Sequence, residues 1–81
     1  MNNQEMKNMY LELVKRDVFA LKHIPEKYID REICLEAVRN DGRALFYIPE
    51  EYIDKEMCLE AVKENELALR LVPEEYIDQI K

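Results

Sequence analysis

One 24-residue sequence is repeated along the chain. Residues 30–53 and 54–77 agree at 14 of their 24 positions, and residues 6–29 are a more divergent third copy. A fixed period of 20–50 residues is typical of supersecondary units that stack on one another, because one such unit cannot bury its apolar face alone. The repeat therefore predicts three stacked units, and it constrains the fold more than any other feature of the chain.

Length and composition set further limits. The 81 residues predict a single domain, 1–81. With 48% apolar and 37% charged residues, the chain suits a packed core under a charged surface. The formal net charge of −6 disfavours direct binding of nucleic acid, which needs several Lys or Arg side chains on one face. The acidic balance fits solubility or a basic protein partner.

Each copy contains the signals of two helices. In the middle copy, Asp30 is a good N-cap for a helix over residues 31–40, which carries a broad apolar stripe. A second, shorter helix is expected over about 42–48, and Pro49 ends it because the residue before proline avoids the helical conformation. Asp17, Asp41 and Asn65 are the expected caps of these second helices. The predicted fold class is all-α: three stacked 24-residue helix–turn–helix repeats that form a short α-solenoid-like bundle.

The copies also differ in ways that predict local structure. The first helix is expected to begin near Asn2 or Asn3 and to run to about Arg16. Gly42 corresponds to Val18 and Glu66, so a left-handed glycine conformation is not required there. Two leucine ladders are expected in the core, namely Leu11/Leu35/Leu59 and Leu21/Leu45/Leu69.

A longer pattern runs from Cys34 to Tyr52 and recurs from Cys58 to Tyr76: Cys-Leu-Glu-Ala-Val-x5-Ala-Leu-x3-Pro-Glu-Glu-Tyr. It resembles the bacterial and giant-virus repeats of the domain-of-unknown-function family 4116. Those repeats carry an Ala-Val, a Gly, an Ala-Leu and a final Pro. The matching residues here are Ala37-Val38, Gly42, Ala44-Leu45 and Pro49. The resemblance implies a helical-repeat fold and brings no assigned activity, cofactor or site residue.

Little in the sequence points to catalysis. The chain has no serine or threonine, so a serine-type triad is excluded. Cys34 and Cys58 occupy equivalent positions and are expected to be reduced thiols in the core. His23 is the single imidazole, and a Cys34–His23 dyad is the one conceivable nucleophile–base pair. We expect no enzyme activity, no metal site and no cofactor.

The recurring aspartates Asp30, Asp54 and Asp78 have two interpretations. We interpret them as N-caps of successive helices. The alternative is a carboxylate ladder for a metal ion or for catalysis.

Candidate partner-binding residues lie where the copies disagree, because core and cap positions recur while other positions are free to meet a partner. The second helices differ at Lys22/Phe46/Arg70 and at His23/Tyr47/Leu71. The predicted partner-binding residues are Phe46, Tyr47, His23, Arg70 and Leu71. The structural alternative is that one of Phe46 and Tyr47 belongs to the core while the other covers the edge of a neighbouring unit.

These patterns favour a non-enzymatic protein–protein interaction module. The alternative is a small acidic inhibitor that binds a basic nucleic-acid-handling protein. A phage is one conceivable source of such an inhibitor. A third interpretation is a unit of a longer repeat array that acts only as a scaffold.

The expected location is the cytoplasm without membrane contact, because the start lacks the features of a secretory signal. A weak homodimer is expected to use the apolar ends (Met6, Met9, Tyr10, Ile77 and Ile80) or the Phe46/Tyr47 edge. The helix face that carries Glu12, Glu36 and Glu60 would repel its own copy.

Overall fold

The computed structural model describes residues 2–80, and this part of the chain is all-helical without a strand. Residues 2–80 form four α-helices and five 3₁₀ helices, with one or two 3₁₀ helices between each α-helix and the next. In chain order the elements are α1 (Asn3–Arg16), η1 (Val18–His23), η2 (Glu26–Tyr28), α2 (Arg31–Asn40), η3 (Gly42–Tyr47), η4 (Glu50–Tyr52), α3 (Lys55–Glu64), η5 (Glu66–Leu71) and α4 (Glu74–Ile80). The all-α prediction is confirmed.

The expected α-helices form where the sequence places them. Helix α2 covers residues 31–40 as predicted, and α1 begins at Asn3 and ends at Arg16. The N-cap carboxylates of Asp30 and Asp54 accept hydrogen bonds from the amides of Ile33 and Met57, at 3.0 and 2.9 Å. Each carboxylate thereby satisfies an amide that has no partner inside its own helix.

The second helix of each copy is a 3₁₀ helix rather than a short α-helix. Each is six residues long and lies between a capping Asp or Asn and a residue that precedes proline. The caps bond to the second residue after them, as when the Phe19 amide donates to Asp17 Oδ1 at 2.9 Å. So short a segment favours the tighter 3₁₀ winding, in which the first backbone bond closes one residue earlier than in an α-helix.

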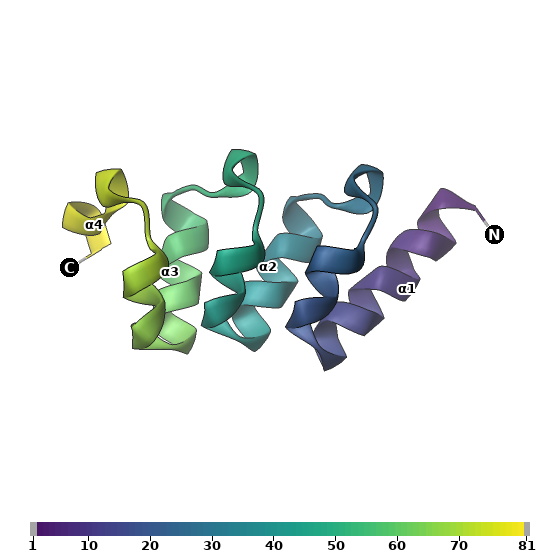
Figure 1. Cartoon of the computed structure of the whole chain (residues 1–81), viewed down its shortest axis with the longest axis horizontal. Helices are drawn as coiled ribbons and strands as arrows, with labels where there is room; N and C mark the ends of the chain where they lie inside the picture. Colours follow the sequence, from purple (N-terminus) through teal and green to yellow (C-terminus); the bar gives the residue numbers. More distant parts are fainter. Residues whose placement is uncertain (1, 81) are drawn as a thin grey trace.

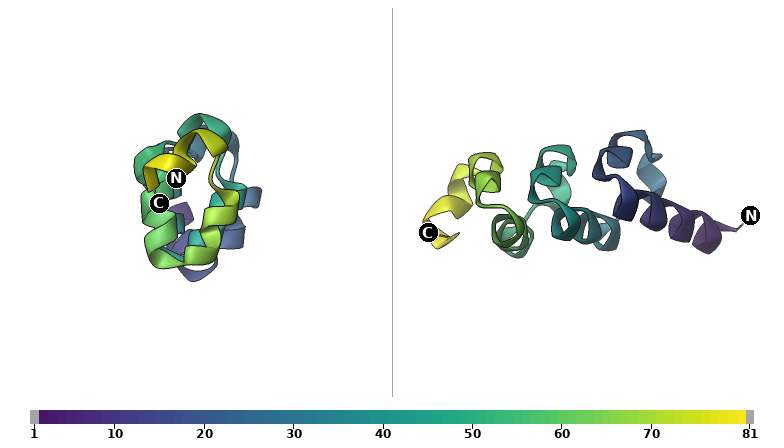
Figure 2. Two further views of the ribbon diagram at one scale, coloured as in Figure 1. Left: turned by 90° about the vertical axis from the view of Figure 1, so that its left-hand side faces the viewer. Right: turned by 90° about the horizontal axis from the view of Figure 1, so that it is seen from below.

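The elements lie in a row with the termini at opposite ends, and the described residues extend over 44 × 22 × 16 Å (Figure 1). Helix α2 packs against both α1 and α3, and η3 packs against both η1 and η5. In Figure 1 the three six-residue 3₁₀ helices lie along the lower front of the row, with η2, η4 and α4 along the top. The right view of Figure 2 shows the same succession from below, and the left view looks along the row from its C-terminal end.

The core consists of small and medium apolar side chains. Ile33, Met57, Cys34, Cys58 and the alanines between them are fully buried. The expected ladder Leu11/Leu35/Leu59 is confirmed only in part: Leu11 and Leu35 are partly buried and pack against the core, and Leu59 has intermediate exposure. In α2 and α3, small side chains instead occupy fully buried positions, namely Cys34, Ala37, Cys58 and Ala61.

The second expected ladder fits better. Leu21 and Leu45 are almost completely buried, and Leu69 is partly buried. Leu69 belongs to η5, which packs against η3 and α3.

Gly42 is needed for a steric reason, not for a left-handed conformation. No residue among those described has a positive φ angle, as the alignment with Val18 and Glu66 predicted. A Cβ atom built on Gly42 would overlap the carbonyl oxygen of Ala61 in α3. The Gly42 amide donates to Glu64 Oε1 at 2.5 Å, so α3 lies directly against the start of η3.

The third copy ends differently from the other two. Ile29 and Ile53 leave the helical conformation after their 3₁₀ turns, whereas Ile77 continues as part of α4. Asp78 therefore lies exposed inside α4, and its expected role as an N-cap is wrong. Within residues 2–80, no helix combines the length and the apolar character that a membrane span requires.

Candidate partner-binding face

The 3₁₀ helices place nine side chains at three repeat positions along one side of the row. We call this surface the 3₁₀ face. Its members are Phe19, Lys22, His23, Arg43, Phe46, Tyr47, Leu67, Arg70 and Leu71. All of them lie at positions where the three copies differ.

The period of the 3₁₀ helix explains which side chains reach solvent. Residues three apart eclipse one another in such a helix. Val18, Leu21 and Ile24 therefore share the buried side of η1. The next residue in each triplet faces outward, which places Phe19 beside Lys22 and, one copy later, Arg43 beside Phe46.

Three large apolar side chains of this face are exposed. The exposed fraction is 70% for Phe46, 58% for Leu67 and 45% for Phe19. Tyr47 is half-buried and bridges two copies. Its ring centre lies 5.3 Å from that of Phe19 and 5.2 Å from that of Phe46, both in edge-to-face geometry. Such pairs stabilise the ring positions beyond simple area burial, so the aromatic edge is held in place.

These side chains surround an open hollow of about 340 Å³. Phe19 of η1, Phe46 and Tyr47 of η3, and Leu67 and Leu71 of η5 form its apolar wall. The hollow joins residues that are up to 52 positions apart in the chain, from Phe19 to Leu71. It exists because η1, η3 and η5 lie side by side.

Two arginines complete the wall, and their surroundings differ. Arg43 Nε and Nη2 donate to Asp41 Oδ1 and Oδ2 at 3.0 and 2.7 Å. These bonds hold the pKa of Asp41 below its ordinary value. Arg70 makes no ion pair with a carboxylate within the described residues. The guanidinium of Arg70 is therefore the cation that remains available at this wall.

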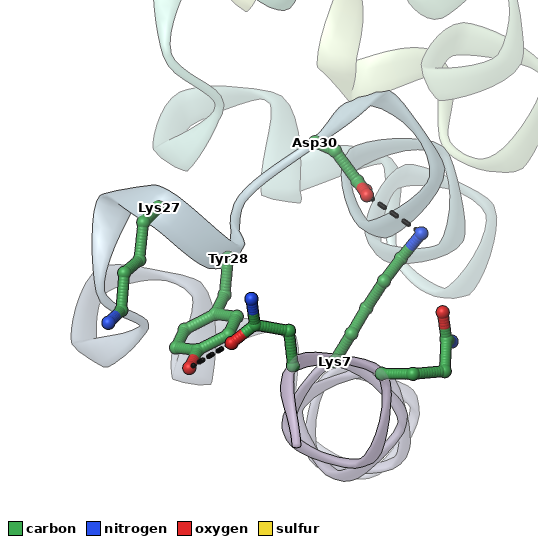
Figure 3. A pocket seen from close by; sticks show the side chains of 6 residues that line it. Lys7, Lys27, Tyr28 and Asp30 are labelled. Atoms are coloured by element: carbon green, nitrogen blue, oxygen red, sulfur yellow. Dashed lines mark hydrogen bonds and ion pairs between the residues drawn. The ribbon is translucent and has the colours of Figure 1, made fainter.

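A second hollow, of about 260 Å³, lies between α1 and the start of α2 (Figure 3). Lys7 reaches from α1 to its rim, where Lys7 Nζ lies 2.8 Å from Asp30 Oδ2 and 2.6 Å from Glu32 Oε1. These two carboxylates raise the pKa of the Lys7 ammonium above its ordinary value. Lys7 and Asp30, which line this hollow, are therefore already paired with one another, whereas Lys27 Nζ lies 5.2 Å from the centre of the Tyr28 ring.

The same arrangement recurs one copy later. Arg31 Nη1 lies 2.5 Å from Asp54 Oδ2, and Arg31 Nη2 lies 2.7 Å from Glu56 Oε1. Arg31 stands 24 residues after Lys7, and its two acidic partners stand 24 residues after those of Lys7. Because the pattern follows the repeat, we interpret it as a junction between successive copies rather than as a ligand site.

The sequence profile of the family described as "Domain of unknown function (DUF4116)" matches residues 7–53, which is more than half of the chain. The protein belongs to the DUF4116 family. The match covers the first two copies of the repeat almost completely. No curated protein and no solved structure matches the chain.

The residues that carry the DUF4116 pattern are packing residues. Ala37, Val38 and Ala44 are fully buried, Leu45 is nearly so, and Gly42 lies against α3. The family pattern therefore describes how successive units fit together. It does not include the exposed side chains of the 3₁₀ face.

The structure brings four of the five expected partner-binding residues together. Phe46, Tyr47, Arg70 and Leu71 line the hollow of the 3₁₀ face. His23 is exposed at the end of η1 but does not line it. The edge-covering alternative holds for Tyr47, which packs on Phe19 of the preceding copy, while neither aromatic residue is fully buried.

Sequence reasoning missed three lining residues, Phe19, Arg43 and Leu67. They occupy one repeat position and differ completely among the copies. The criterion that selected the other candidates, disagreement between copies in the second helix, would have found them. It was applied to the last two positions of that helix and not to its second residue.

The chemically reactive side chains are poorly placed for reaction. Cys34 and Cys58 are free thiols with no exposed surface. Burial raises the pKa of Cys34 to about 12 and that of Cys58 to about 11, so both thiols stay protonated at neutral pH. A thiol, unlike a thiolate, is a weak nucleophile. His23 is exposed, and the imagined Cys34–His23 dyad lacks an activated sulfur.

The aspartates likewise do not converge on a metal. Asp30 and Asp54 cap α2 and α3 and pair with Lys7 and Arg31. In the part of the chain that the structure describes, no three His, Cys, Asp or Glu side chains are placed to hold an ion. The N-cap interpretation is confirmed for these two residues.

Proposed function

We propose that this protein is a non-enzymatic protein–protein interaction module and that its 3₁₀ face meets the partner. The observation that carries the proposal is the exposure of Phe46, Leu67 and Phe19 around one hollow. Exposed aromatic and apolar side chains that gather in one concave patch are typical of interaction sites. Core packing does not require these side chains, because Leu21, Leu45 and Leu69 already fill the inner side of the same helices.

We infer that the architecture serves this role as a short α-solenoid-like bundle of three stacked units within a single domain, 1–81. Support comes from the contacts of α2 with both α1 and α3, and of η3 with both η1 and η5. In stacked repeat proteins each unit contacts its neighbours and the row offers an extended surface for binding. The variable side chains of the 3₁₀ face are displayed on such a row.

The test is capture of a partner from native lysate with the full chain as bait. Phe46→Glu places a charge at the most exposed residue of the face and is expected to abolish capture. Leu13→Glu is the matched control, because Leu13 is also exposed (42%) but lies on α1 and does not line the hollow. Capture that survives Phe46→Glu and is lost in Leu13→Glu would place the partner surface elsewhere.

The second candidate function is a small acidic inhibitor of a basic nucleic-acid-handling protein. The observation in its favour is a row of exposed glutamates along η2, η4 and the start of α4: Glu26, Glu50, Glu51, Glu74 and Glu75. A partner bound through these charges should be released as salt rises. The double variant Glu50→Lys/Glu51→Lys should then abolish capture, while Phe46→Glu should leave it intact.

Self-association is a further proposal. At one apolar end Met9 is exposed and Met6 and Tyr10 are partly buried, and at the other end Ile77 and Ile80 are partly buried. A weak homodimer would use an end or the Phe46/Tyr47 edge and not the face that carries Glu36. Sedimentation of Tyr47→Glu beside Glu36→Lys tests this choice of surface.

We further propose that the protein acts in the cytoplasm, where Cys34 and Cys58 stay reduced. We expect it to make no direct contact with nucleic acid or membrane.

A further inference from the structure

We propose that the occupant of the 3₁₀ face is an acidic peptide segment of a partner protein, which inserts an apolar side chain into the hollow and pairs a carboxylate with Arg70. This inference rests on the proposed function and names the chemistry of the partner. It is drawn from the charge of the face, the size of the hollow and the pairing of its two arginines.

The 3₁₀ face differs in charge from the rest of the molecule. The chain as a whole carries 12 basic and 18 acidic residues. The helices η1, η3 and η5 together contain the bases Lys22, Arg43 and Arg70 and the single acid Glu66. The carboxylates of Asp17 and Asp41 flank this surface; both accept amide hydrogen bonds as N-caps, and Asp41 is also the ion-pair partner of Arg43. Among the described residues, Lys22 and Arg70 are the cations of the face without a carboxylate partner, and they favour an acidic ligand over a basic one.

Arg70 is the side chain that can use this complementarity. The guanidinium of Arg43 is already held by Asp41 through two hydrogen bonds. Arg70 lines the same hollow and makes no ion pair within residues 2–80. A guanidinium binds a carboxylate through two parallel hydrogen bonds, which fixes orientation as well as charge. An acidic residue beside the inserted side chain would therefore bind Arg70 without breaking an existing pair.

The hollow limits what can enter it. Its volume of about 340 Å³ lies at the small end of the range of about 300–1,000 Å³ that is typical of small-molecule sites. Its wall is apolar apart from the two arginines. One or two apolar side chains of a peptide match such a space, with the flanking residues of the peptide lying across the 3₁₀ helices.

Single-stranded nucleic acid is the competing class of ligand, because exposed aromatic rings beside arginine can stack bases. Binding of that kind also needs a row of cations that follows the phosphate backbone. Among residues 2–80, Lys22 and Arg70 are the cations of this face that make no ion pair, and the chain has a net charge of −6. The observations favour a peptide.

The experiment is selection of short random peptides, displayed on phage, against the immobilised full chain. The expected result is enrichment of sequences that place Asp or Glu near a large apolar residue. A fluorescent copy of one selected peptide is then titrated with each variant, and anisotropy reports the dissociation constant. Arg70→Glu is expected to weaken binding at least about tenfold, the effect of reversing one close charge pair. Selection against Arg70→Glu should instead enrich peptides with Lys or Arg at the acidic position.

Lys63→Glu is the matched control for charge. Lys63 is exposed on α3 and does not line the hollow. The variant Lys63→Glu changes the net charge by the same amount as Arg70→Glu. It is expected to alter the dissociation constant less than about twofold, because exposed distant charges are screened by salt. An equal loss of affinity in both variants would show that net charge rather than Arg70 determines binding, and would overturn the inference.

Phe46→Ser separates failure of this inference from failure of the proposed function. If Phe46→Ser abolishes binding but the peptides carry no acidic residue, or Arg70→Glu has no effect, the face is correct and the acidic partner is wrong. If Phe46→Ser leaves the affinity unchanged, the peptides bind elsewhere and the face itself is wrong. Lack of any enriched peptide, or tighter binding of oligo(dT) or oligo(U) that Phe46→Ser abolishes, would also overturn the inference.

Discussion

The α-carbon of Gly42 lies so close to the carbonyl oxygen of Ala61 that a Cβ atom on residue 42 would overlap that oxygen. The contact joins the start of η3 to α3, the helix of the next copy. The equivalent residues Val18 and Glu66 show that the position tolerates a side chain in the other copies. The glycine is therefore specific to one junction between copies.

Gly42→Ala is expected to lower the free energy of unfolding by about 1–3 kcal/mol, because the added methyl group must displace backbone of α3. Glu66→Ala is the control, since Glu66 is exposed at the equivalent position, and its effect should stay within about 0.5 kcal/mol. Urea denaturation followed by circular dichroism measures both. Equal stability of Gly42→Ala and the wild type would contradict the close approach of η3 and α3.

The Lys7–Asp30 pair predicts a pH dependence of stability. Partial burial opposes ionisation of Asp30, but hydrogen bonds from Lys7 and the Ile33 amide outweigh it and hold the pKa of Asp30 below its ordinary value of 3.8. Between the lowered pKa of Asp30 in the folded protein and its ordinary value in the unfolded chain, the unfolded chain binds more protons than the folded protein. The free energy of unfolding therefore rises with pH in this range. The contribution of ionised Asp30 to the free energy of unfolding is complete above pH 3.8. It is lost as the pH falls through the lowered pKa.

Asp30→Asn isolates this effect, because asparagine caps a helix about as well as aspartate. The variant should lose a few tenths to about 1 kcal/mol at neutral pH, as is usual for an ion pair that solvent reaches. It should also show a shallower loss of stability in acid. Asp78→Asn, in which an exposed residue of α4 is changed, is expected to follow the wild-type profile. Parallel acid profiles for Asp30→Asn and the wild type would rule out the proposed role of Asp30.

The buried cysteines predict slow thiol chemistry. With pKa values of about 12 and 11 and no exposed surface, Cys34 and Cys58 should resist modification by an aromatic disulfide reagent at pH 8. Modification requires opening of the fold, so both thiols should react rapidly in denaturant. The measurement is the release of the coloured thiol with time. Fast reaction of either residue in the native protein would mean that its helix is not packed as described.

Adjacent residues of η3 should differ sharply in their effect on stability. Leu45→Ala removes a side chain that is 2% exposed and should cost about 2–5 kcal/mol. Phe46→Ser removes a side chain that is largely exposed, with one edge contact to Tyr47, and should cost less than about 1 kcal/mol. Thermal unfolding of the two variants provides the comparison. A large loss in Phe46→Ser would mean that this ring belongs to the core and is not free to bind.

Much of the local structure could be read from the sequence. The bounds of α1 and α2 and the caps Asp30, Asp54, Asp17, Asp41 and Asn65 are confirmed. These features depend on hydrogen bonds between residues two or three apart and on the restriction that proline imposes on its neighbour. Interactions of such short range are present in the sequence itself, and three similar copies reveal them three times.

Other features depend on residues that are far apart in the sequence, 19 positions for Gly42 and Ala61 and 23 for Arg31 and Asp54. The burial of Cys34 in place of Leu35, the contact of Gly42 with Ala61 and the bond from Arg31 to Asp54 all arise where one copy packs on the next. A periodic pattern identifies an apolar side of a helix but not the distance or rotation at which its neighbour lies. For that reason the first leucine ladder is confirmed only in part and the steric need for Gly42 was missed.

In the candidate site, too, some features follow from the sequence and others arise only from packing between the copies. Comparison of the copies identified Phe46, Tyr47, Arg70 and Leu71 as candidate partner-binding side chains, because core positions recur and these do not. It could not show that they share one hollow with Phe19 and Leu67, or that Arg43 is paired while Arg70 is not. The repeat specifies how each unit folds, since that is set by local bonds. The surface between units is set by side-chain packing across η1, η3 and η5, which exists only once the row has formed.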